Sequence, residues 1–142
     1  MAVTSLDWSA VWAGTRADLA VLVPVVAVYA VLHGTGTIHG DAGTVATAVI
    51  AVLVAPAVGG WVTSHRAPPG SPLKHAATAT AIAALAYVAF RGIDAVVRDR
   101  PLNGASVAAF VIVSVVVGVL GGGAAQVHRR PKAGGSADGQ AS

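Results

Sequence analysis

Long uninterrupted runs of apolar residues dominate the pattern along this chain, and the polar residues gather at the ends of the runs. Four runs are long enough to form membrane-crossing helices: residues 17–33, 43–64, 75–97 and 104–127. A bilayer core about 30 Å thick needs roughly 20 mostly apolar residues per helix. The runs are continuous rather than alternating and longer than barrel strands, so they predict helices. We therefore expect an all-α, polytopic four-transmembrane-helix bundle.

The four runs leave little chain for anything else. We expect a single transmembrane domain over residues 1–132 and a disordered cytoplasmic tail over 133–142, which is rich in Gly and Ser. Residues 6–13 are predicted either as a short interfacial helix, with Ser5 as its N-cap, or as an extension of the first helix. A cleaved signal peptide is the alternative for the first run, although Asp7 and Asp18 are unusual in such a segment.

The composition agrees with a membrane protein. Of the 142 residues, 55% are hydrophobic and only 11% are charged, against about 25% charged in average soluble domains. A soluble fold of this size could not bury so much apolar surface. The chain has no Cys, which excludes disulfides, thiolate metal sites and cysteine nucleophiles.

Basic residues near the ends of the runs predict the orientation, because cytoplasmic loops carry an excess of Lys and Arg. One side would hold six basic residues: Arg16, Arg66, Lys74, Arg129, Arg130 and Lys132. The other side would hold three: Arg91, Arg98 and Arg100. We therefore expect a multi-pass protein of the cell membrane with both termini in the cytoplasm.

A short motif occurs at the ends of the second and fourth runs. Residues 59–68 and 122–131 both fit G-G-x-x-x-x-H-R-x-P, 63 residues apart. The motif predicts an internal repeat of two parallel helical hairpins, with coincidence in a Gly-rich chain as the alternative. It also places basic side chains at the headgroup level, where Arg meets lipid phosphate. The candidate contacts for an anion or a lipid headgroup are His65, Arg66, His128 and Arg129; the alternative is that they only anchor the helix ends.

Small residues recur at four-residue spacing within the runs, which places them on one helix face. Because lipid solvates apolar side chains, helices in a membrane associate through close contact at small residues. The predicted packing positions are Gly59, Gly60, Gly118 and Gly122. Faces through Ala51 and Ala55, through Ala76, Thr80 and Ala84, and through Ser114 are expected to join them in the bundle interior. Contact between copies in a homo-oligomer is the competing use.

Charged residues within the runs would indicate transport. Arg16 and Asp18 lie near one end of the first run and are interpreted as interfacial. Arg91, Asp94 and Arg98 share one face at the end of the third run. They are interpreted either as a helix end with snorkelling Arg side chains or as a polar vestibule.

The connection between the second and third runs carries a resemblance. Gly59-Gly60 through Arg66-Ala67-Pro68, followed by Ser71-Pro72-Leu73-Lys74-His75, resembles an uncharacterised family of small four-helix membrane proteins from actinobacteria and other prokaryotes. The resemblance implies a four-helix membrane fold and implies no activity.

No nucleotide-binding loop, nucleophile elbow or zinc helix motif occurs in the sequence. We therefore expect no enzyme, cofactor, metal site or nucleic-acid partner. The expected function is a non-catalytic structural, assembly or regulatory membrane component, with the lipid bilayer and a homo-oligomer or another membrane protein as partners. A passive channel or small-solute transporter and a phage-type holin are the alternatives.

Overall fold

The computed structural model describes residues 5–37, 41–97, 99, 101 and 103–129. Every regular element there is helical: α1 (Trp8–Gly34), α2 (Asp41–Val49), the π-helix η1 (Ile50–Val54), α3 (Ala55–Arg66), α4 (Pro72–Val97) and α5 (Gly104–Arg129). Four stretches are long and apolar enough to cross a membrane. The all-helical prediction is confirmed, whereas the tail over 133–142 lies outside the described residues.

The first helix begins earlier than the apolar run. Asp7 is its N-cap, and the Asp7 carboxylate accepts a hydrogen bond from Ser9 N–H at 2.9 Å. The predicted cap at Ser5 was wrong, since Asp7 occupies that position. From Trp8 onward the helix is continuous to Gly34, so residues 6–13 include the first turns of α1 and form no separate interfacial helix. A carboxylate at the N-cap satisfies N–H groups that the first turn leaves unpaired.

The second apolar run is continuous but changes its helical register. A π-helical turn over Ile50–Val54 separates α2 from α3, and Ala55 N–H bonds to the carbonyl oxygen of Ile50 five residues earlier. Pro56 follows directly. Proline has no N–H to donate and its ring crowds the preceding turn of an α-helix. The wider π turn accommodates both effects, so here the proline coincides with a register change inside the span.

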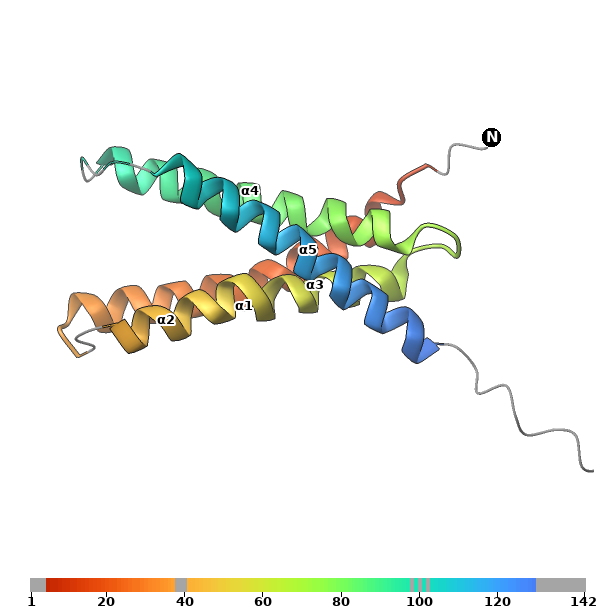
Figure 1. The fold of residues 1–142 in the computed structure, drawn as a ribbon, viewed down its shortest axis with the longest axis horizontal. Helices are drawn as coiled ribbons and strands as arrows, with labels where there is room; N and C mark the ends of the chain where they lie inside the picture. Colours follow the sequence, from red (N-terminus) through yellow and green to blue (C-terminus); the bar gives the residue numbers. More distant parts are fainter. Residues whose placement is uncertain (1–4, 38–40, 98, 100, 102, 130–142) are drawn as a thin grey trace, which may run out of the picture.

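The helices form two antiparallel hairpins that cross (Figure 1). One hairpin contains α1 with α2, η1 and α3, and the other contains α4 and α5. α3 contacts α1, α4 and α5, whereas α1 and α5 make no contact within the described part of the chain. The hairpins meet at the end that holds Trp8, Arg66, Pro72 and Arg129, called the packed end below. They diverge toward the end that holds Gly34 and Val97, called the open end.

The two copies of the sequence motif lie at corresponding places in the two hairpins. Gly59 to Arg66 belong to the end of α3, and Gly122 to Arg129 belong to the described end of α5. The internal repeat itself stays a prediction.

Candidate functional site

Glycines bring the backbones of α1, α3 and α5 together at the packed end. Gly14 of α1 lies against Gly59 and Thr63 of α3: a Cβ built on Gly14 would approach the Gly59 carbonyl oxygen to 2.7 Å. On the neighbouring face of α3, a Cβ on Gly60 would overlap the Gly118 carbonyl group of α5. Side chains at these positions would push the helices apart, so the residue type sets the distance between them.

The contact of α5 with α4 also depends on small residues. A Cβ on Gly118 would meet the Thr80 side chain, and one on Gly122 would lie 2.9 Å from the Ala76 Cβ and 2.5 Å from Ser64 Oγ. All four predicted packing glycines thus lie where helices touch: Gly59 against α1, Gly60 against α5, and Gly118 and Gly122 against α4, with Gly122 also reaching Ser64 of α3. The predicted faces of α4 and α5 are buried at Ala76, Thr80, Ala84 and Ser114.

A buried histidine joins the start of α1 to the start of α4. His75 is 1% exposed, and its Nε2 accepts a hydrogen bond from Asp7 N–H at 2.7 Å. Its Nδ1 donates to the Ser71 carbonyl oxygen at 2.8 Å. An amide can only donate and a carbonyl can only accept, so these partners fix the ring tautomer. The sequence placed His75 at the start of the third span without assigning this role.

Threonines supply further polar contacts within the helix contacts of the packed end. Thr15 is buried, and its Oγ1 lies 3.0 Å from the Val11 carbonyl oxygen and 3.1 Å from that of Ala79 in α4. Thr63 Oγ1 donates to the Gly59 carbonyl oxygen at 2.7 Å. Such bonds satisfy a hydroxyl without water, which suits an apolar environment. In contrast, Ser64 Oγ and Ser114 Oγ are buried with no hydrogen-bond partner among the described residues.

Asp18 is buried between helices, which its place in the sequence did not show. Its side chain is 3% exposed and packs against α3, where a Cβ on Gly59 would lie 2.8 Å from the Asp18 Cβ. Its predicted position near the membrane interface stays a prediction. Neighbouring Arg16 is exposed. A buried carboxyl group inside an apolar helix is costly, and ionisable residues in such positions commonly have a function. The chain therefore does carry an ionisable residue inside a candidate span.

The structure brings together three of the four predicted headgroup contacts. His65 stacks on Trp61 with ring centroids 5.1 Å apart, and His128 lies on the same ring at 6.0 Å. Arg129 Nη1 donates to the Ser64 carbonyl oxygen at 3.1 Å, so it ties the end of α5 to α3. Arg66 is exposed at the last turn of α3. The sequence motif thus marks two helix ends that meet around one tryptophan.

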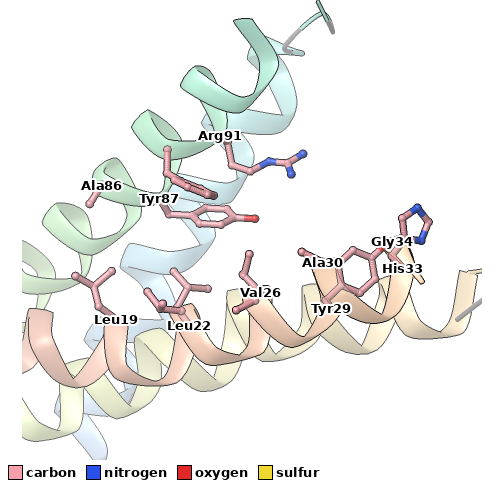
Figure 2. A pocket seen from close by; sticks show the side chains of 13 residues that line it. Leu19, Leu22, Val26, Tyr29, Ala30, His33, Gly34, Ala86, Tyr87 and Arg91 are labelled. Carbon is pink, nitrogen blue, oxygen red and sulfur yellow. The ribbon is translucent and has the colours of Figure 1, made fainter. Parts of the chain in front are cut away.

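A cleft of about 630 Å³ separates α1 from α4 toward the open end. Figure 2 shows Leu19, Leu22 and Val26 rising from α1, while Tyr87 and Arg91 reach toward them from α4. The described residues that line the cleft all belong to these two helices, and its walls are mostly apolar. His33 and Arg91 are the basic residues among the lining residues.

Sequence reasoning missed the cleft because it arises from the divergence of two hairpins. Arg91 was noticed for its position on a charged helix face, but nothing in the sequence showed that α1 would face it. No family model, curated protein or solved structure matches this chain. The arrangement described here therefore carries the functional argument alone.

Proposed function

We propose that this chain is a multi-pass integral membrane protein of the cell membrane that acts as a non-catalytic structural, assembly or regulatory component. The observation that carries the proposal is the set of four helices long and apolar enough to cross a bilayer. In this proposal the helices form a four-helix bundle, the packed end faces the cytoplasm with both termini, and the open end lies at the opposite face.

The exposed side chains support this placement. Large apolar residues are exposed on every long helix, for example Val31 of α1 at 62%, Val96 of α4 at 83% and Leu120 of α5 at 66%. Large apolar side chains exposed at this level along every long helix are what lipid-facing surfaces carry. The interior, in contrast, is built from Gly, Ala, Ser and Thr, as is typical of helix contacts in lipid.

Membrane fractionation and topology mapping test this proposal. The full chain is expected to stay in the membrane pellet after an alkaline carbonate wash. Reporter domains fused at either terminus, or after Pro68, are expected to report the cytoplasm, and a reporter at residue 101 the opposite side. Release by carbonate, or an odd number of crossings, would contradict the proposal.

The aromatic and basic cluster at the packed end supports a contact with anionic headgroups in the proposed cytoplasmic leaflet. Arg66 is exposed there, and the His65 and His128 rings flank Trp61. Trp and Arg favour the headgroup level because each combines an apolar body with a polar tip. Replacing both Arg66 and Arg129 with Gln is expected to weaken binding to anionic vesicles; unchanged binding would remove this part of the proposal.

A small-solute transporter or channel is the second candidate, and buried Asp18 is the observation that favours it. Ionisable residues inside membrane spans commonly mark ion or proton pathways. The π-helix η1, which contacts α1 and α5, is also a feature frequent at functional sites. Ion flux into proteoliposomes that disappears in Asp18→Asn would favour this candidate. Equal, background flux in both proteins would favour the non-catalytic component.

A further inference from the structure

We infer that the cleft between α1 and α4 binds one anionic phospholipid, with an acyl chain between the helices and the phosphate at Arg91. This inference rests on the proposed membrane insertion. It adds a ligand and a site at the open end, away from the basic cluster around Trp61. Figure 2 shows the arrangement that supports it.

The cleft has the dimensions and lining that an acyl chain requires. Along α1 it extends from Leu19 to His33, which is roughly 21 Å at a rise of about 1.5 Å per residue. One leaflet contributes about half of a hydrocarbon core of roughly 30 Å, so the cleft is long enough for the chain of a lipid in that leaflet. Its volume of about 630 Å³ lies within the ordinary range for ligand sites.

The polar groups of the cleft gather toward its open end. His33 lies one residue before the end of α1, and its ring stacks on Tyr29 with centroids 5.6 Å apart. Arg91 is exposed and reaches into the space between the helices. Arg offers planar donors that match a phosphate group. The apolar residues around Leu22 would contact an acyl chain, and the basic residues His33 and Arg91 would contact the headgroup.

Charge and openness favour a lipid over other occupants. Among the described residues that line the cleft there is no Asp or Glu, so a second copy docking by this surface would bring another Arg91 and no countercharge from those residues. A small soluble anion would leave the apolar walls unused. Because the described walls of the cleft come from two helices, a lipid could enter sideways from the bilayer.

The test compares lipid binding to the purified full-length chain by native mass spectrometry. Phosphatidylglycerol and phosphatidylcholine with identical acyl chains are titrated in parallel. The wild type is expected to retain phosphatidylglycerol preferentially, and Arg91→Gln is expected to lower that preference about five-fold, the contribution of one Arg near an anionic surface. Lys74→Gln is the matched control, since it removes one exposed charge at the other end of α4.

A second pair of variants tests acyl-chain binding in the cleft separately from the charge of Arg91. Ala86→Trp fills the cleft and is expected to lower retention of both lipids, whereas Ala89→Trp adds the same bulk on α4 at a residue outside the lining. These substitutions introduce bulk at exposed positions, so the fold should tolerate both. A thermal unfolding temperature equal to that of the wild type would show that each variant is folded.

Four outcomes would overturn the inference. They are equal retention of the two lipids by the wild type, equal effects of Arg91→Gln and Lys74→Gln, equal effects of the two Trp variants, and a dimer whose formation abolishes lipid binding. In each of these cases a protein that resists the carbonate wash still supports membrane insertion. Release by the wash would overturn the inference together with the proposed function.

Discussion

The packed end and the open end of this molecule are built from the same helices but by different contacts. At the packed end, backbone meets backbone, as where Gly60 of α3 lies on Gly118 of α5. At the open end, larger side chains such as Val26 and Tyr87 face each other across a cleft. Backbone contact leaves little freedom, whereas an open cleft can change its width.

The polar contacts with defined geometry lie at one end of the fold. Buried polar groups with defined partners, such as His75 and Thr15, belong to the packed end. The lining of the open end is mostly exposed or half-buried, with Leu22 as the exception. The packed end thus has directional contacts, whereas the open end has apolar surface that the proposed lipid would cover.

Enlarging a glycine at the packed end is expected to have the largest effect. Gly60→Leu forces a side chain into the Gly118 backbone, which cannot move aside. We therefore expect the free energy of unfolding to fall by about 3 kcal/mol or more, the usual upper limit for overpacking. Thermal unfolding in detergent measures the loss. Gly123→Leu is the control, because a Cβ there meets nothing within 4 Å. Equal unfolding temperatures for the two variants would contradict the role of the glycine contacts at the packed end.

Removing the buried histidine is expected to cause the second-largest loss of stability. His75→Ala leaves the Asp7 N–H without its partner and removes the ring's hydrogen bond to the Ser71 carbonyl oxygen. That carbonyl keeps the backbone N–H of residue 75, so we expect the free energy of unfolding to fall by about 2 kcal/mol. Hydrogen exchange should quicken in the first turn of α1 and at the start of α4. His33→Ala, at an exposed residue of the open end, should change neither. Slow exchange at Ala10 and Val11 in His75→Ala would show that the hydrogen bond is dispensable.

One pair of substitutions on α4 compares the two ends directly. Ala79 is fully buried, so Ala79→Leu is expected to cost between about 1 and 3 kcal/mol through overpacking. Ala86, two turns further along, is exposed in the cleft wall, so Ala86→Leu should stay within about 0.5 kcal/mol of the wild type. Chemical denaturation in mixed micelles gives both values. Similar losses would mean that the cleft is closed in the membrane.

The smallest expected effect concerns a single hydroxyl. Thr15→Val keeps the side-chain shape but removes the contact of Oγ1 with the Ala79 carbonyl oxygen, which should cost about 1 kcal/mol. Thr78→Val removes a hydroxyl that donates to the Lys74 carbonyl oxygen of its own helix, and this change is expected to be near neutral. The difference between the two in thermal unfolding measures the contact between α1 and α4. A zero difference would leave this contact to apolar packing alone.

Much of the fold could be predicted from the order of apolar and polar residues. The four long helices and the small-residue faces follow from local spacing, because residues four apart share a helix face. The sequence motif offered a meeting of His65 and His128 only as one of two alternatives, and the structure places both rings beside Trp61. The cap at Asp7, the π turn before Pro56 and the burial of Asp18 did not follow. Each depends on which neighbour lies across a helix contact, and local spacing carries no such information.

The sequence by itself determined that hydrophobic helices of span length would form, because the length and continuity of an apolar run are local properties. It also determined where backbones could approach, since only glycine leaves that space. Tertiary structure alone decided that α3 would occupy the centre, that His75 would hold the start of α1, and that two hairpins would diverge to leave a cleft. These features arise from the crossing of the hairpins, which is set by the sum of contacts between residues far apart in the chain.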